Sequence, residues 1–257
     1  MPERDTVYFI SDAHLGIDFG AAGAREAHLI KFLRSSADRM SHLFIVGDLF
    51  DFWVEYREAI RPVFFNILHV LRSLVESGIQ IHYLAGNHDF ALGSFLPEKI
   101  GIQLHYEGYR TTLQGKVVHI QHGDGLLASD VAYRVLKRIQ RNKTNQRLFR
   151  LLHPNLGVLI AQSMSLKSRN SKREEQAVEN LPEYRDYARR ITEQGPDIVI
   201  LGHTHHPGLH HFSNGKVYCN TGEWIHRYTF GKLFKGRMQL FEHIPGNPAL
   251  ELSAVSE

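Results

Sequence analysis

A short apolar run that ends in a glycine and an aspartate constrains the fold of this chain most. Residues 44–48 read Phe-Ile-Val-Gly-Asp, and Asp51 follows in the next turn. An unbroken apolar run favours a strand that is buried on both faces, as in a parallel sheet covered by helices. Because the glycine lets the backbone turn sharply, the pattern predicts that Asp48 reaches the edge of an α/β sheet, where such sheets bind ligands.

Four other polar clusters follow short apolar runs in the same way. They are Asp12-Ala13-His14, Gly86-Asn87-His88-Asp89, His122-Gly123-Asp124 and Gly202-His203-Thr204-His205. Two of these clusters hold donors two residues apart, Asp12 with His14 and His203 with His205. On an extended segment such residues project to the same side, so both members of a pair can reach one ion. We therefore expect distant parts of the chain to form a single polar site.

Strands are expected at residues 7–10, 42–46, 79–84, 103–106, 109–113, 116–121 and 197–201, with helices over 20–37 and 59–77. The initial strand–helix–strand–helix–strand order predicts parallel pairing with right-handed crossovers. Further strands are expected at 209–212, 217–220, 224–230 and 237–244, followed by a disordered polar tail. The chain of 257 residues is expected to form one domain, residues 1–257, with a helical insertion at about 126–182.

The totals limit the classes of protein that the chain can belong to. No apolar run reaches the ~18 residues of a transmembrane helix, and the charged start, residues 1–5, does not resemble a secretory signal. The single cysteine, Cys219, excludes an internal disulfide and is typical of a reducing compartment. These features favour a cytoplasmic protein.

The expected insertion is both basic and apolar. Residues 134–173 contain no Asp or Glu, and the cations there are Arg134, Lys137, Arg138, Arg141, Lys143, Arg147, Arg150, Lys167, Arg169, Lys172 and Arg173. Many leucines and other apolar residues lie between them. One interpretation is a solvated helical hairpin with its own small core. The other is a lid over a substrate with anionic and apolar parts, or a contact with an anionic membrane surface.

Seven oxygen and imidazole donors gather at the expected strand ends: Asp12, His14, Asp48, Asn87, His122, His203 and His205. This set suits Mn²⁺, Fe²⁺ or Zn²⁺ better than Ca²⁺, and it lacks the thiolates of an iron–sulfur cluster. Seven donors are too many for one ion, but with Asp48 as a bridge they suit two ions about 3.5–4 Å apart. Such a pair activates water for attack on phosphorus. We expect His88 to protonate or stabilise the leaving oxygen, and Asp51 to orient the other ring nitrogen of His88.

The five clusters, in this order, resemble the calcineurin-like metallophosphoesterase superfamily. The resemblance implies an α/β fold, a double β-sandwich flanked by helices, with a dinuclear site. By motif position, Asp12, His14, Asp48 and His205 would hold one ion, and Asp48, Asn87, His122 and His203 the other. Every position is filled, which argues against a non-catalytic member of the superfamily.

Residues 47–53, residues 89–93 and the insertion resemble, more narrowly, the UDP-2,3-diacylglucosamine hydrolase family. This resemblance implies cleavage of the pyrophosphate of a UDP-linked diacylated glucosamine in lipid A synthesis, with release of UMP. It also implies that the insertion is a lid for acyl chains and that the protein lies peripherally on the inner membrane. The implied substrate contacts are Asn87, His88, Asp130, Tyr133, Arg169, Asn170, Ser171, Lys172 and His203. The sequence departs from this family at His88, where many members have Arg, and at residues 173–178.

Three other functions remain open from the sequence. A phosphatase or phosphodiesterase for a soluble substrate would use the same donors, with the insertion meeting another anion. A nuclease could use the basic segment, but aromatic stacking residues are sparse in that segment, which disfavours nucleic acid as a partner. A scaffold or membrane-recruitment module would use the insertion without needing two ions.

Overall fold

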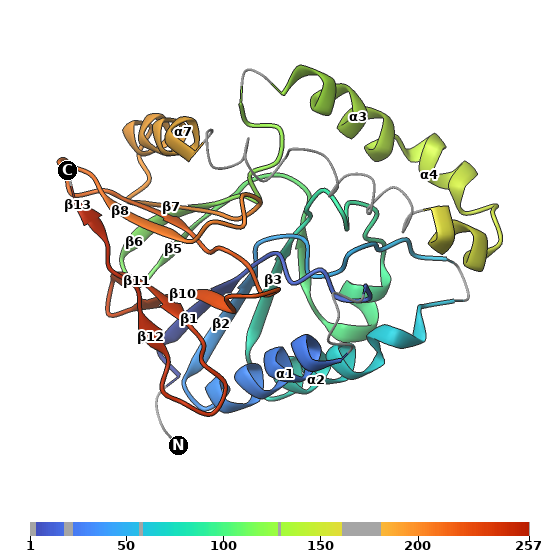
Figure 1. Ribbon diagram of the computed structural model, residues 1–257, viewed down its shortest axis with the longest axis horizontal. Helices are drawn as coiled ribbons and strands as arrows, with labels where there is room; N and C mark the ends of the chain where they lie inside the picture. Colours follow the sequence, from blue (N-terminus) through green and yellow to red (C-terminus); the bar gives the residue numbers. More distant parts are fainter. Residues whose placement is uncertain (1–3, 18–22, 57–58, 128–129, 161–180, 257) are drawn as a thin grey trace.

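The structure is a computed structural model that describes residues 4–17, 23–56, 59–127, 130–160 and 181–256. Two β-sheets pack against each other, with helices α1 (Ala24–Ser36) and α2 (Phe65–Glu76) on one side. Helix α7 (Leu181–Glu193) lies on the opposite side (Figure 1). The expected α/β double sandwich flanked by helices is confirmed.

The first sheet has seven strands, four of which run parallel. Its spatial order is β12-β11-β10-β1-β2-β3-β4, with β1 (Thr6–Ile10), β2 (Met40–Ile45), β3 (Gln80–Leu84), β4 (Gln103–His105), β10 (Thr229–Phe234), β11 (Arg237–Glu242) and β12 (Leu250–Glu251). Strands β1 to β4 pair in parallel, and β10 joins β1 antiparallel. The carboxyl ends of β1, β2 and β3 therefore lie at one edge of this sheet.

The second sheet has six strands in the order β13-β8-β9-β7-β6-β5. Its strands are β5 (Tyr109–Leu113), β6 (Lys116–Ile120), β7 (Ile198–Leu201), β8 (Gly208–His211), β9 (Val217–Asn220) and β13 (Val255–Ser256). Strands β6, β7 and β9 pair in parallel, although about 80 residues separate β6 from β7. The loops after β6 and β7 consequently leave the sheet side by side.

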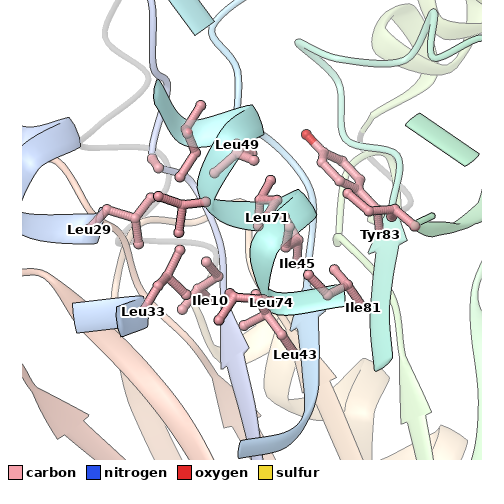
Figure 2. Packing of buried hydrophobic residues seen from close by; sticks show 14 of the residues in the cluster. Ile10, Leu29, Leu33, Leu43, Ile45, Leu49, Leu71, Leu74, Ile81 and Tyr83 are labelled. Carbon is pink, nitrogen blue, oxygen red and sulfur yellow. The ribbon is translucent and has the colours of Figure 1, made fainter. Parts of the chain in front are cut away.

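Three clusters of apolar side chains hold these elements together, the third of which packs α7 against the second sheet. Alternate residues of β1 face opposite sides: Val7 and Phe9 pack between the sheets, whereas Tyr8 and Ile10 pack towards the helices. Figure 2 shows the second cluster, in which residues of α1 and α2 cover β1, β2 and β3. The labelled side chains are Ile10, Leu29, Leu33, Leu43, Ile45, Leu49, Leu71, Leu74, Ile81 and Tyr83. Burial on both faces explains why these strands are mainly apolar.

Several element boundaries differ from the expectation. The helix expected from Ala59 begins at Phe65, after a 3₁₀ turn over Pro62–Phe64. Proline lacks a backbone N–H and fits only the first helical turn, so it marks this start. The strand expected over 224–230 lies at Thr229–Phe234 instead, and the tail expected to be disordered forms β12 and β13.

The insertion contains α3 (Val131–Arg141) and α4 (Lys143–Phe149), which lie outside the two sheets (Figure 1). Residues 161–180 fall outside the described part of the chain. That residues 1–257 form one domain with an insertion at about 126–182 stays a prediction. Within the described residues, no helix combines the length and apolarity needed to cross a bilayer.

Candidate metal centre

The loops that follow β1, β2, β6 and β7 are joined to one another by backbone hydrogen bonds. The N–H of Asp12 donates to the carbonyl of Gly47 at 3.1 Å, and the N–H of His14 donates to the carbonyl of Asp48 at 3.0 Å. The N–H of Gly202 donates to the carbonyl of His122 at 2.8 Å. These bonds continue the parallel pairing beyond the strand ends and bring the expected donors together.

Five of the seven expected donors have a left-handed backbone, with φ between 44° and 69°: Asp12, His14, Asp48, His203 and His205. This conformation is uncommon for residues other than glycine. Strained backbones of this kind persist where surrounding structure holds them, and they cluster at functional sites. The loops after β1, β2 and β7 therefore turn at the residues that carry the donors.

Two glycines allow the loops to approach closely. A Cβ atom at Gly86 would lie 2.0 Å from Oδ1 of Asp48, and a Cβ atom at Gly202 would lie 2.8 Å from Oδ2 of Asp12. Only a residue without a side chain fits at these positions without movement of the neighbouring carboxylates.

Asp12, His14 and His205 form the first group of donors. Nε2 of His205 lies 3.3 Å from Oδ1 of Asp12 and 3.3 Å from Nε2 of His14. Nε2 of His14 lies 3.9 Å from Oδ2 of Asp48. These four side chains are the set that the family resemblance assigns to one ion.

Asp48, Asn87 and His122 form the second group. Nε2 of His122 lies 3.4 Å from Oδ2 of Asp48 and 3.1 Å from Oδ1 of Asn87. Nδ1 of His122 donates to the carbonyl of Val46 at 2.8 Å, so this bond fixes the ring with Nε2 turned towards the other donors. The ring centroid of His203 lies 5.1 Å from that of His122. All seven expected donors thus lie in one cluster.

The chemistry of this cluster fits divalent cations. Within the described residues, Oδ1 of Asp12 is buried and has no hydrogen-bond donor. Asp12, Asp48 and His122 are all at most 2% exposed, and each offers an atom within 4.8 Å of the others. A buried carboxylate oxygen without a donor is costly unless a cation compensates it. Oxygen and imidazole ligands are those preferred by Mn²⁺, Fe²⁺ and Zn²⁺.

The electrostatics of the site indicate the same need for positive charge. Burial would raise the pKa of Asp48, but His122, His88 and His14 hold it far below its usual value. Burial would lower the pKa of His122, but Asp48, Asp12 and Asp124 raise it to about 10. Because the carboxylates stabilise any positive charge placed among them, divalent cations there would be stabilised in the same way.

His88 and Asp51 lie together, but their contact differs from the expected one. Nδ1 of His88 donates to the backbone carbonyl of Asp51 at 2.9 Å, whereas the Asp51 carboxylate lies 3.6 Å from that nitrogen. The same carboxylate oxygen lies 3.6 Å from Nδ1 of His14. The backbone of Asp51 therefore orients the His88 ring, and its carboxylate lies between two imidazoles.

The residues expected to contact substrate from the insertion are only partly described. Asp130 precedes α3, and Tyr133 on α3 has its ring centroid 6.4 Å from that of His203. Its hydroxyl donates to Oδ2 of Asp124 at 2.8 Å. Arg169, Asn170, Ser171 and Lys172 lie outside the described residues.

Two buried carboxylates, Asp89 and Asp124, belong to the expected polar clusters, but the motifs predict no role for them. Asp89 accepts hydrogen bonds from the N–H of Gly86 at 2.9 Å and from the Tyr83 hydroxyl, which closes the loop that carries Asn87. Asp124 pairs with Lys137 at 2.6 Å. Both follow a predicted donor by two residues, and that spacing was the only signal for them in the sequence.

A double sandwich with buried carboxylates and imidazoles at its strand ends defines a metallophosphoesterase. A model of the calcineurin-like phosphoesterase family matches residues 6–207. The chain belongs to this family and is a metallophosphoesterase, and membership of the family implies divalent metal ions.

Two similar proteins are described as UDP-2,3-diacylglucosamine hydrolase. The protein from Porphyromonas gingivalis is 30% identical over 256 residues, which cover 93% of this chain and 97% of that protein. The protein from Neisseria meningitidis serogroup B is 32% identical over 222 residues, which cover 86% and 90%. Among solved structures, Vacuolar Protein Sorting 29 from Cryptosporidium parvum aligns with a TM-score of 0.49 and 15% identity, over 97% of this chain and 98% of that one.

Proposed function

We propose that this enzyme hydrolyses the pyrophosphate of a UDP-linked diacylated glucosamine, in lipid A synthesis, and releases UMP. The observation that carries the proposal is the similarity to proteins described as UDP-2,3-diacylglucosamine hydrolase over more than nine tenths of both chains. Because the alignment covers 93% of this chain, it includes part of the insertion as well as the sheets. The insertion is where a lipid-linked substrate would differ from a soluble one.

Two divalent ions would be held by the two donor groups. Asp12, His14, Asp48 and His205 would hold one, and Asp48, Asn87, His122 and His203 the other. We expect Mn²⁺, with Fe²⁺ and Zn²⁺ as alternatives that the same donors accept. When bound, such ions supply Lewis-acid activation of water and of the phosphoryl group.

The remaining groups of the site act on the substrate directly. The N–H of His88 donates to Oδ1 of Asp48 at 2.9 Å, so the loop that carries His88 also holds the proposed bridging carboxylate. With its Nδ1 bound to the Asp51 carbonyl, His88 would use Nε2 to protonate or stabilise the leaving oxygen. Asn87 and His203 would contact the phosphoryl oxygens.

The surface of the insertion supports a substrate that combines acyl chains and phosphates. Val131, Val135 and Ile139 recur every four residues on α3 and are 59%, 54% and 52% exposed. Arg138 and Arg141 lie in the last turn of the same helix. Apolar groups of this kind would bind acyl chains, and guanidinium groups would bind phosphates. Asp130, Tyr133 and residues 169–172 are proposed to complete these contacts.

The same surface would place the enzyme on the inner face of the inner membrane. An amphipathic basic helix is attracted to anionic headgroups and buries its apolar side chains at the interface. Co-sedimentation with vesicles of phosphatidylglycerol and phosphatidylethanolamine tests this arrangement. Binding that disappears with phosphatidylcholine alone, or in 1 M salt, supports the proposal. Equal recovery in the supernatant with both vesicles would exclude it.

The substrate is tested with metal-free protein reloaded with Mn²⁺. UDP-2,3-diacylglucosamine is supplied in mixed micelles, and UMP release is followed by chromatography. We expect turnover with Mn²⁺ and none with excess chelator. If the reloaded protein instead hydrolyses soluble phosphomonoesters or diesters and leaves the lipid nucleotide intact, the alternative of a phosphatase or phosphodiesterase with a soluble substrate replaces the proposal.

A further inference from the structure

Asp124 connects the metal-ligand loop to the insertion. It lies two residues after His122 and is 3% exposed. Its Oδ2 atom lies 2.6 Å from Nζ of Lys137 and accepts a hydrogen bond from the Tyr133 hydroxyl at 2.8 Å. Nζ of Lys137 also donates to the backbone carbonyl of Asp124 at 3.2 Å.

Lys137 and Tyr133 are four residues apart on α3, so they lie on the same face of that helix. This face is turned towards Asp124 and His203 in the loops after β6 and β7, whereas the apolar side chains Val131, Val135 and Ile139 are exposed. Apolar burial therefore contributes little to holding α3 in place. A buried carboxylate that receives an ammonium and a hydroxyl is a stronger constraint, because an unpaired charge there would be costly.

A second ion pair also joins α3 to the rest of the protein, but it leads elsewhere. Arg141 lies 3.1 Å from Glu107, which is in the loop between β4 and β5 and has an 81% exposed side chain. That loop carries none of the seven expected metal donors. The Lys137–Asp124 pair thus attaches α3 at the site, and the Arg141–Glu107 pair attaches it away from the site. Removing each pair in turn compares the two attachments.

The loop after β6, which carries His122 and Asp124, is also bonded to segments that carry other donors of the site. The carbonyl of His122 accepts from Gly202, directly before His203. Nδ1 of His122 is held by the Val46 carbonyl beside Asp48. Asp124 therefore extends from a loop that is bonded to the segments carrying Asp48 and His203, so a helix bound to Asp124 takes its position from the metal centre.

We propose that Asp124 is a positioning residue that sets where α3 stands relative to the metal centre, through its bonds to Lys137 and Tyr133. The inference rests on the proposed function. In that function α3 positions the part of the substrate that lies outside the cluster of donors. It applies to the large lipid nucleotide and not to a small diester that reaches only the metal centre.

The test compares Lys137→Met, Asp124→Asn, the double variant and the control Glu107→Gln. For each, kcat/KM is measured for UDP-2,3-diacylglucosamine and for bis(p-nitrophenyl) phosphate, and the ratio of the two gives the selectivity. We expect the selectivity to fall by about tenfold in Lys137→Met and in Asp124→Asn. The double variant should be no worse than either single variant, since both remove one interaction. Lys137→Arg should recover most of the selectivity.

An equal fall in selectivity in Glu107→Gln would overturn the proposal, because the loss of any attachment of α3 would then lower the selectivity. Additive losses in the double variant, or unchanged selectivity in Lys137→Met, would overturn it as well. Hydrogen exchange of residues 131–141 provides a readout that needs no substrate. We expect it to accelerate by at least about fivefold in Lys137→Met and less in Glu107→Gln. If the wild-type enzyme does not cleave the lipid nucleotide, the proposed function fails. Equal hydrogen-exchange rates of residues 131–141 in Lys137→Met and Glu107→Gln would separately refute the role of Asp124.

Discussion

The carboxylate of Asp48 lies 3.4 Å from Nε2 of His122. The same oxygen, Oδ2, lies 3.9 Å from Nε2 of His14. One carboxylate oxygen therefore faces an imidazole from each of the two donor groups. A single side chain in this position can contact two cations. The loss of Asp48 would therefore weaken the binding of both.

We predict that Asp48→Asn abolishes the proposed hydrolysis and the binding of at least one ion. The amide lacks the negative charge that two cations require between them, and the expected loss of activity is at least about 100-fold. Metal content after reloading with Mn²⁺, measured by mass spectrometry, checks the cause. Asp186→Asn is the control, because Asp186 is exposed on α7 and pairs only with Arg189 among its described ionic contacts. Full metal content in Asp48→Asn would contradict the bridging role.

We predict that Gly86→Ala disrupts the same site from the backbone side. The new Cβ would lie 2.0 Å from Oδ1 of Asp48, so the carboxylate or the loop must move. The expected costs are about 1–3 kcal/mol in unfolding free energy and a reduced affinity for Mn²⁺. Urea unfolding and a metal titration measure them. Gly208→Ala is the matched control, because its nearest neighbour would be the side-chain nitrogen Nε2 of His210 at 3.2 Å. Similar effects in both variants would mean that the approach to Asp48 is not responsible.

The sequence was sufficient to predict the cluster because side-chain type and strand-end position determine it. Asp12, Asp48, His122 and His203 each follow an apolar strand, and the carboxyl ends of parallel strands meet at one edge. The paired sheets were expected from the resemblance to a known family. The roles of these residues as ligands remain predictions that the experiments above address.

Other contacts could not be predicted because they depend on backbone atoms or on tertiary packing. His88 is oriented by the backbone carbonyl of Asp51. Because every residue has a backbone carbonyl, a sequence motif does not reveal this contact. Asp124 and Lys137 are 13 residues apart, on a loop and a helix whose relative placement sequence periodicity does not give. The polar composition of the tail predicts disorder, but the backbone of the tail pairs with the edges of both sheets.

We predict that His88→Gln lowers kcat by about 10²–10⁴-fold while both ions remain bound. The side chain is not among the proposed ligands, but it lies beside them, with its ring centroid 4.7 Å from that of His14. Asp51→Asn should have a smaller effect on kcat, since the backbone carbonyl that holds the His88 ring is retained. Parallel measurements of kcat and metal content test both statements. Loss of an ion in His88→Gln would assign His88 to metal binding instead of proton transfer.

The last prediction concerns stability in acid and a group of histidines outside the site. His82 on β3 contacts Nε2 of His105 at 3.1 Å, and its ring stacks on Phe44. His42 and Tyr109 flank the same stack. Burial lowers the pKa of His82, and the nearby His105 and His42 lower it further, to about 4. His82 therefore stays neutral in the folded protein at a pH where an unfolded chain would be protonated.

The sign of the effect follows from proton binding. Between pH 6.5 and 4 the unfolded state binds a proton at His82 that the folded state does not, so stability falls as the pH drops through this window. Over the full window the loss amounts to about 2–3 kcal/mol. His82→Phe retains a stacking ring but cannot bind a proton, so its unfolding free energy should depend less on pH by this amount. Urea unfolding at pH 7.0, 5.5 and 4.5 measures the difference. His69→Phe, an exposed position on α2, should keep the pH dependence of the wild type. If His82→Phe also keeps it, acid sensitivity arises elsewhere in the protein.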